Sequence, residues 1–254
     1  MKPLAGVRVV VTRAASQSAE WVAAFRRAGA EVAALPLLEI LPPANPAELA
    51  AAADLARRAP FDWWVFTSAN AVRAFLPLLS PEVPRSALCA AVGPATEEAL
   101  EAAGIGVDCR PATDRSHAEG LVRALAPRVA GKRVLVPLAE DARPTMVDGL
   151  QRAGAEVLPV VAYRKTMPAD AGAQAARLFA SPPWGWVTVT SPRLARHLRR
   201  VLGERWHEGR STLRAASIGP RTSAALRDLG LDPAAQAVEP SAAGLVAAVV
   251  AAHR

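Results

Sequence analysis

Residues that commonly bind metals or form disulfides are scarce in this chain. There are only two cysteines, Cys89 and Cys109, and four histidines among 254 residues. Both cysteines lie in predicted strands without CxxC spacing, so small core side chains are the favoured interpretation and a disulfide is the alternative. The histidines form no HExxH or paired-ligand spacing. We therefore expect no metal site.

Long hydrophobic runs are also absent. No apolar run reaches the roughly 18 residues that a membrane span needs. The first residues, MKPLAGVRVVVTR, contain an apolar stretch broken by Arg8 and Arg13 and lack a cleavage-site pattern, so they predict a strand and not a signal peptide. We expect a cytoplasmic protein without a membrane partner, and a monomer because no spare apolar face is visible.

Lysine and the aromatic residues are few, although the net charge is +7. Of 30 basic residues only Lys2, Lys132 and Lys165 are lysines, and there are six Trp, five Phe and one Tyr. No block of five basic residues occurs, and basic and aromatic residues do not alternate. This pattern disfavours nucleic acid and leaves a polyanionic small molecule as the expected partner. A nucleic-acid-binding regulator rests on the pI of 10.6 alone.

The common catalytic and nucleotide-binding motifs are missing. The first predicted strand is not followed by GxGxxG, and neither GxxxxGK[ST] nor GxSxG occurs. No side chain stands out as a nucleophile.

A long internal repeat is what the chain does contain. RAGAEV occurs at 27–32 and again at 152–157. Three further blocks recur in the same order at offsets of 123–126 residues: 66–75 with 189–198, 92–105 with 218–231, and 119–125 with 243–249. Matched blocks in one order indicate duplication of a five-strand unit.

Short apolar runs alternate with helical patterns along the whole chain. We expect strands at 7–12, 31–36, 62–67, 87–92, 106–110, 132–137, 156–163, 185–190, 214–218 and 235–238. Helices are expected between them, one opening with a capping box of Ser116 and Glu119, and 164–170 is expected to be a linker. The alternation predicts α/β architecture with parallel sheets and right-handed crossovers.

The corners between strands and helices are the predicted ligand sites. In open parallel sheets, ligands bind beyond the carboxyl ends of the strands. The corners Thr67–Ser68 and Thr190–Ser191 match each other, as do Gly93–Pro94 and Gly219–Pro220. Backbone N–H groups at a helix start favour anions. Ordinary capping is the alternative for any one corner, whereas their repetition favours a shared anion site.

An ordered set of motifs at these corners resembles the uroporphyrinogen-III synthase family. The motifs are VTR (11–13), FTSANAV (66–72), AVGPAT (91–96), AYR (162–164), VTSP (189–192), IGPRT (218–222) and EPSAAGLV (239–246). Each is weakly specific, but they span the chain in the expected order. The resemblance implies two similar flavodoxin-like parallel-sheet domains joined by a two-stranded connector, with the substrate in a cleft between them.

The family layout also implies domain boundaries. One domain would comprise 1–37 and 166–254, and 38–165 would be inserted as the second. The connectors would lie near 36–41 and 160–166. Each copy of RAGAEV then leads to a point where the chain passes from one domain to the other.

The resemblance implies cyclisation of hydroxymethylbilane to uroporphyrinogen III, with inversion of ring D through a spiro intermediate and release of water. It implies no metal and no cofactor. The expected partner is the linear tetrapyrrole substrate, with transient contact to the enzyme that makes it as a further possibility. A non-catalytic two-domain binder of a small polyanion is the alternative.

The site residues follow from the same resemblance. Tyr163, the single tyrosine, matches a family tyrosine at the cleft and is the candidate catalytic residue; packing at an interface is the alternative. The candidate substrate-binding residues are Arg13, Ser68, Gly93, Thr96, Arg143, Ser191, Gly219, Thr222 and Ser241. The corner at Ser191 departs from its copy because Pro192 lacks an N–H.

Overall fold

The computed structural model describes residues 2–79, 87–112, 117–180, 185–208 and 212–253. The chain divides into two compact units. Unit 1 consists of Met1–Glu39 and Thr166–Arg254, and unit 2 of Ile40–Lys165.

Unit 1 contains a five-stranded sheet in the order β2-β1-β8-β9-β10. Each adjacent pair in this sheet is parallel. Numbered along the chain, the order is 2-1-3-4-5, which is the flavodoxin-like arrangement. The strands are β1 (Arg8–Val11), β2 (Glu31–Ala34), β8 (Gly185–Val189), β9 (Leu213–Ser217) and β10 (Pro233–Gln236).

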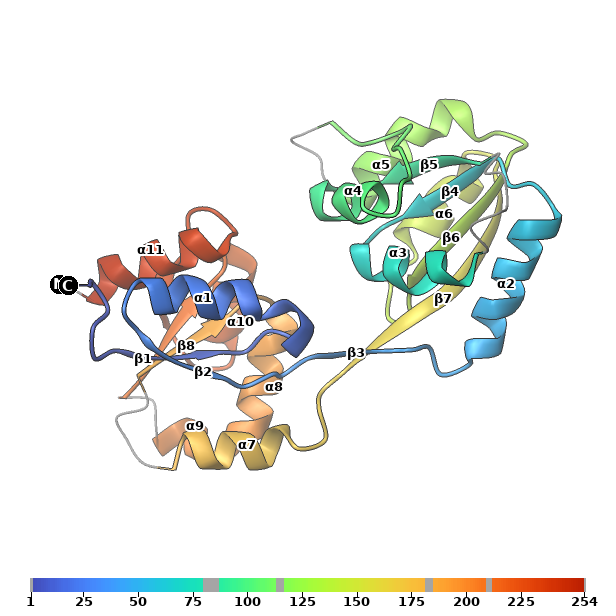
Figure 1. Cartoon of the computed structure of the whole chain (residues 1–254). Helices are drawn as coiled ribbons and strands as arrows, with labels where there is room; N and C mark the ends of the chain where they lie inside the picture. Colours follow the sequence, from blue (N-terminus) through green and yellow to red (C-terminus); the bar gives the residue numbers. More distant parts are fainter. Residues whose placement is uncertain (1, 80–86, 113–116, 181–184, 209–211, 254) are drawn as a thin grey trace. The chain divides into compact units, whose positions relative to one another are not determined.

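Helices cover both faces of this sheet. On one face α1 (Ala19–Arg27) lies beside α11 (Ala242–His253), as Figure 1 shows, and they bury Phe25 and Leu245. The other face packs α7 (Ala171–Leu178), α8 (Pro192–Leu202), α9 (Arg205–Glu208) and α10 (Pro220–Asp228). The short 3-10 helix η1 (Ala15–Gln17) precedes α1. Burial on both faces explains the continuous apolar strand sequences.

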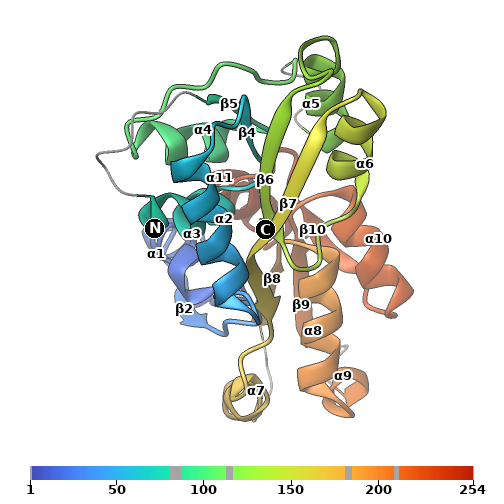
Figure 2. The same ribbon diagram turned by 90° about the vertical axis from the view of Figure 1, so that its right-hand side faces the viewer.

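Unit 2 contains the second sheet, in the order β3-β7-β6-β4-β5. Its strands are β3 (Glu39–Leu41), β4 (Trp63–Phe66), β5 (Leu88–Ala91), β6 (Arg133–Ala139) and β7 (Glu156–Thr166). Figure 2 shows β6 and β7 side by side, and they are parallel. The predicted class, α/β with two parallel-sheet domains, is confirmed.

The two sheets repeat one spatial order with different chain connections. Arg133 lies opposite Glu156 on β6 and β7, as Arg8 lies opposite Glu31 on β1 and β2. Strand β4 then neighbours β6 as β8 neighbours β1. In unit 2, however, β4 and β5 precede β6 and β7 along the chain, and β3 is added beside β7. Unit 2 is therefore a circular permutation of unit 1.

The helices of unit 2 also form two layers. One face packs α2 (Pro46–Arg58), α3 (Ala69–Phe75) and α4 (Pro94–Glu101) over Phe66 and Leu135. The opposite face packs α5 (Ala118–Leu125) and α6 (Thr145–Arg152) over Val65 and Val136. The 3-10 helices η2 (Leu76–Leu78) and η4 (Ala126–Arg128) extend α3 and α5.

The structure corrects two sequence-based boundaries. The strand expected at 106–110 is reduced to a single parallel bridge between Ala90 and Cys109. Asp108 does not extend a ladder there because its carboxylate accepts the N–H of Cys89. Strand β7 continues to Thr166 instead of ending at Tyr163, so the first residues of the expected 164–170 linker belong to the sheet.

Helix starts largely follow their predicted caps. Ser68 and Ser191 accept the N–H groups of Ala71 and Leu194 through their hydroxyl oxygens. The predicted capping box fails at α5, because the ring Nδ1 of His117 accepts the N–H of Gly120. Its proposed first member, Ser116, lies outside the described residues.

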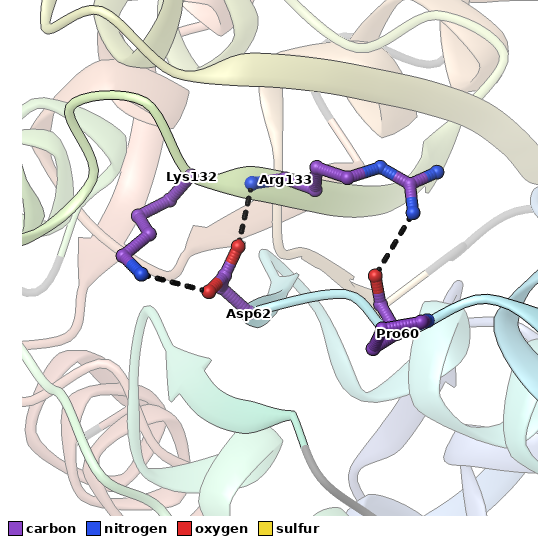
Figure 3. Close-up of polar contacts among 4 residues, drawn as sticks. All are labelled: Pro60, Asp62, Lys132 and Arg133. Carbon is purple, nitrogen blue, oxygen red and sulfur yellow. Dashed lines mark hydrogen bonds and ion pairs between the residues drawn. The ribbon is translucent and has the colours of Figure 1, made fainter.

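Asp62 holds the amino ends of two strands together (Figure 3). Its carboxylate accepts the backbone N–H of Arg133 at 2.9 Å and the ammonium of Lys132 at 3.0 Å. Arg133 in turn donates to the carbonyl oxygen of Pro60 at 3.0 Å. Asp62 directly precedes β4 and Arg133 begins β6, so these bonds fix the register at the edge opposite the strand-to-helix corners.

Both cysteines are buried free thiols, which confirms their interpretation as core residues. Cys89 packs with the α2–α3–α4 layer and Cys109 with the α5–α6 layer. Burial is the main cause that raises the pKa of the Cys109 thiol. Among the described helices none is long and apolar enough to cross a membrane.

Candidate functional site

The carboxyl edge of the unit 2 sheet gathers four predicted positions. Strands β4, β5, β6 and β7 run parallel to their neighbours, so the chain leaves them at the same edge. Ser68 follows β4, Gly93 follows β5, Arg143 follows β6, and Tyr163 lies opposite the last residue of β6. This edge is where an open parallel sheet binds ligands.

Ser68 and Tyr163 form the closest pair at this edge. The hydroxyl oxygens of the two side chains are 3.0 Å apart, although the residues are 95 positions apart in sequence. Tyr163 is 4% exposed and packs with Ala139 and Ala162. The hydrogen bond satisfies the phenol at the end of a mostly apolar contact.

A register shift explains why Tyr163 faces Ser68. Leu138 lies opposite Val161, but Ala139 lies opposite Tyr163, so Ala162 is an extra residue in β7. Val160 and Ala162 pack toward α2 and α3, and strict alternation would point residue 163 toward α5 and α6. The extra residue keeps the ring on the same face as Ala162. Such bulges commonly redirect a side chain beside an active site.

Two charged residues that sequence reasoning missed lie beside this pair. The Lys165 ammonium is 5.4 Å from the centroid of the Tyr163 ring and 3.6 Å from a carboxylate oxygen of Asp141. Lys165 was assigned to a linker because the continuation of β7 was not expected. The place of Asp141 just after β6 is the sequence signal that could have indicated it.

The Gly93–Thr96 corner begins α4 without a side-chain cap. Gly93 precedes α4, and Pro94 occupies its first position, where a missing N–H removes no helical bond. The N–H of Thr96 contacts the Gly93 carbonyl oxygen at 2.9 Å, and the Thr96 side chain is 5% exposed. Thr96 therefore lies under the corner and contributes packing as well as a hydroxyl.

Arg143 lies at the same edge but is exposed. It follows β6 and precedes α6. Its positive charge helps to lower the pKa of Glu119 on α5, after the backbone hydrogen bond of Glu119 and the charge of His117. The charge of Arg143 therefore acts on α5.

In unit 1 the edge begins with Arg13, immediately after β1. Its guanidinium carbon lies 4.8 Å from the centroid of the Trp21 ring, and Nη2 donates to Gln17 Oε1 at 3.1 Å. Nε is buried without a hydrogen-bond partner in the described structure. Burial lowers the pKa of Arg13, while the charge of Glu20 opposes that shift. The side chain is thus held in place by two contacts that sequence spacing did not reveal.

The remaining unit 1 candidates begin helices at the same edge. Ser191 caps α8, Gly219 precedes α10, and the Ser241 hydroxyl accepts the N–H of Gly244 at 3.0 Å in α11. Thr222 lies in the first turn of α10 and is 3% exposed. Its counterpart Thr96, in the first turn of α4, is buried as well. These corners thus place capping hydroxyls and helix starts at the carboxyl edge of the unit 1 sheet.

The arrangement suits binding of anions better than binding of a metal. No group of three or more His, Cys, Asp or Glu side chains able to hold a metal occurs in the described ranges. Among the predicted site residues that the structure describes, a side-chain hydrogen bond joins Ser68 to Tyr163 and no other pair. The structure brings these two together and leaves the others as separate corners of each unit.

Fold and site together define a two-unit α/β protein with strand-to-helix corners that favour an anionic ligand. The family model of uroporphyrinogen-III synthase HemD matches residues 19–247. The uroporphyrinogen-III synthase of Synechococcus elongatus is 35% identical over 239 residues, covering 90% of this chain and 88% of that protein. The chain belongs to the uroporphyrinogen-III synthase family.

Solved structures agree at the level of the fold. A mutant uroporphyrinogen III synthase from the extremely thermophilic bacterium Thermus thermophilus superposes with a TM-score of 0.62 at 18% identity, covering 97% of this chain and 98% of that one. Uroporphyrinogen-III synthetase from Helicobacter pylori gives a TM-score of 0.61 at 17% identity, with 96% and 99% coverage. The resemblance seen in the motifs is therefore confirmed across nearly the whole chain.

Proposed function

We propose that this protein cyclises hydroxymethylbilane to uroporphyrinogen III with inversion of ring D, acting as a hydro-lyase in tetrapyrrole and heme biosynthesis. The observation that carries the proposal is the partly buried hydrogen bond between Tyr163 and Ser68 in a member of this family. The phenol lies at the carboxyl edge of a parallel sheet, where a ligand is expected.

In this proposal Tyr163 assists departure of the terminal hydroxyl. Its proton passes to that oxygen, the C–O bond breaks with its electron pair on oxygen, and water leaves. The substituted carbon of ring D then attacks the resulting electrophilic methylene, which gives the spiro intermediate. The intermediate fragments and recloses with ring D reversed, and the proton released at the end restores the phenol. All reacting carbons belong to the substrate, so the chain need supply only positioning and proton transfer.

The other candidate residues bind the carboxylates of the substrate in this scheme. The Arg13 guanidinium supplies a charged donor, and its contacts with Trp21 and Gln17 restrict its freedom before binding. Hydroxyls and backbone N–H groups act at the remaining corners: Ser68, Gly93, Thr96, Ser191, Gly219, Thr222 and Ser241. Arg143 is the weakest member because it is exposed and lies beside Glu119.

The domain assignment remains part of the proposal. Residues 1–37 and 166–254 would form one domain and 38–165 the other, with connectors near 36–41 and 160–166. The division of compact units after Glu39 and after Lys165 supports it. So does the pairing of β3 with β7, the two strands on which the chain enters and leaves unit 2.

We also propose a monomer that makes at most transient contact with the enzyme that produces hydroxymethylbilane. In the described part of the chain the exposed large hydrophobic residues are Leu55, Leu78, Leu88 and Val238. They are too few to form the apolar core of a permanent interface.

Incubation with freshly made hydroxymethylbilane tests the function. The expected product is the type III isomer, whereas spontaneous closure gives type I. If only type I forms at the uncatalysed rate while the substrate still binds, the protein is the non-catalytic polyanion binder. If neither occurs and nucleic acid binds at moderate salt, the basic regulator is the better account.

A further inference from the structure

The Ser68 hydroxyl makes two contacts, one with the backbone and one with Tyr163. Its oxygen accepts the backbone N–H of Ala71 at 3.3 Å and lies 3.0 Å from the phenol oxygen. A serine hydroxyl has one proton to donate. The N–H of Ala71 occupies one of the two lone pairs of the oxygen, so the hydroxyl proton is still free to be donated to the phenol oxygen.

We infer that Ser68 is a positioning residue that donates its hydroxyl proton to Tyr163 and thereby leaves the phenol proton for the substrate. In the reverse arrangement Tyr163 would spend its single proton on Ser68 and have none for the leaving hydroxyl. Donation by Ser68 also stabilises the phenolate that forms after proton transfer, because a charged acceptor strengthens a hydrogen bond. This role rests on the proposed function and differs from carboxylate binding by Ser68.

The surroundings make Ser68 the specific partner of the phenol. Among the described residues no other side chain is hydrogen-bonded to the Tyr163 hydroxyl. Lys165 lies beside the ring and pairs with Asp141, and the exposed Glu140 and Arg164 are next to Asp141 and Tyr163 in sequence. Substitution of Ser68 leaves all four charges in place, so a change in Tyr163 behaviour reports the lost hydroxyl.

The duplicated corner supplies a matched comparison. Ser191 caps α8 through Leu194 as Ser68 caps α3 through Ala71. At the repeat position of Tyr163, seven residues beyond the matched glutamates Glu31 and Glu156, unit 1 has Leu38. Loss of the hydroxyl at Ser191 therefore removes the same kind of cap without removing a tyrosine contact.

Titration of the phenol tests the hydrogen bond without any assay of activity. Tyr163 is the single tyrosine, so ultraviolet difference spectroscopy follows its ionisation alone. In S68A tyrosinate should form at higher pH than in wild type, because the phenolate loses a hydrogen-bond donor. S68T, which keeps a hydroxyl, should titrate like wild type, as should S191A and the cap variant N45A.

S68G guards against a folding failure, because glycine is tolerated at a helix cap. Circular dichroism establishes that each variant is folded before titration. A midpoint in S68A and S68G equal to that of wild type overturns the inference. This result stands whether or not the protein forms uroporphyrinogen III, so failure of the inference is distinguishable from failure of the proposed function.

A double-mutant cycle then tests the catalytic consequence. S68A should lower kcat by roughly 10- to 100-fold, the value of one hydrogen bond to a charged group, with a smaller change in KM. S68A combined with Y163F should be no slower than Y163F alone, because Ser68 acts through the phenol. Multiplication of the two losses, or a change confined to KM, would show that Ser68 acts directly on the substrate.

Discussion

Leu38 takes in unit 1 the repeat position that Tyr163 takes in unit 2. The matched strands share a register, since Glu31 lies opposite Arg8 as Glu156 lies opposite Arg133. Leu38 packs against the core of unit 1, whereas Tyr163 presents a hydroxyl to Ser68. The duplicated corners are therefore chemically unequal. We propose that proton transfer takes place in unit 2. Unit 1 would bind carboxylates and have no part in proton transfer.

Replacement of Tyr163 by Phe should lower kcat by roughly 100-fold, because general acid catalysis contributes about this much. The ring and its packing with Ala139 and Ala162 are kept, so the free energy of unfolding should change little. Initial rates of type III isomer formation and a urea titration measure the two effects. A wild-type rate would remove Tyr163 from the catalytic role.

Replacement of Arg13 by Gln should raise KM by at least about tenfold, because one charge-assisted bond to a carboxylate is lost. The control is R8Q at the other end of β1, where Arg8 is exposed and distant from the carboxyl edge. Steady-state kinetics at two salt concentrations measure both variants. Equal effects of R13Q and R8Q would indicate a general influence of charge and no specific contact.

Replacement of Asp62 by Asn should destabilise the protein by roughly 1 kcal/mol, since two bonds weaken at a partly exposed position. The backbone N–H of Arg133, and then Lys132, lower the folded-state pKa of Asp62. Its contribution is therefore present above the pKa of the unfolded chain and is lost as pH falls through the lowered value.

The stability difference between wild type and D62N should accordingly be largest near neutral pH and shrink in acid. Urea unfolding at several pH values measures it. The control is D148N, because Asp148 is exposed on α6. A difference that grows toward acid would contradict the assigned direction of the pKa shift.

Two glycine substitutions should have opposite effects on stability. A methyl group at Gly244 in α11 would overlap the carbonyl oxygen of Glu239, whereas one at Gly172 in α7 would meet no atom within 4 Å. G244A should lose about 1–3 kcal/mol from overpacking. G172A should gain about 0.5–1 kcal/mol from helix propensity. Thermal unfolding measures both, and equal effects would contradict the close approach at Gly244.

Local sequence was sufficient for the elements whose bonds are local. The strand-to-helix corners at Ser68, Gly93 and Ser191 follow from cap residues and apolar runs. The repeat also predicted equivalent sheets. Prediction failed where a distant partner decides the structure. Thr166 belongs to a strand because β7 pairs within the sheet, and Cys109 keeps one bridge because Asp108 bonds to Cys89.

The candidate site was predictable in its residue types but not in its contacts. The motifs supplied Tyr163 and Ser68 separately, yet only the extra residue Ala162 in β7 turns the phenol toward that serine. Gln17 and Trp21 were not identified as supports of Arg13 because cation–ring and amide contacts leave no spacing signature. Such pairs depend on how side chains pack, and the periodicity of the sequence does not predict that packing.

The permuted strand order of unit 2 has a consequence for the ancestry of the chain. Along the sequence the two halves are a plain tandem repeat, although the equivalent of β10 in the leading half is only the bridge at Cys109. In the structure β1 and β2 of the leading half share a sheet with β8, β9 and β10 of the trailing half. Strands β4 and β5 of the leading half share the other sheet with β6 and β7 of the trailing half. This is the topology that reciprocal exchange of strands between two copies of one unit would give. Each sheet is thus a hybrid of both halves, and neither half-chain supplies an intact present-day sheet alone.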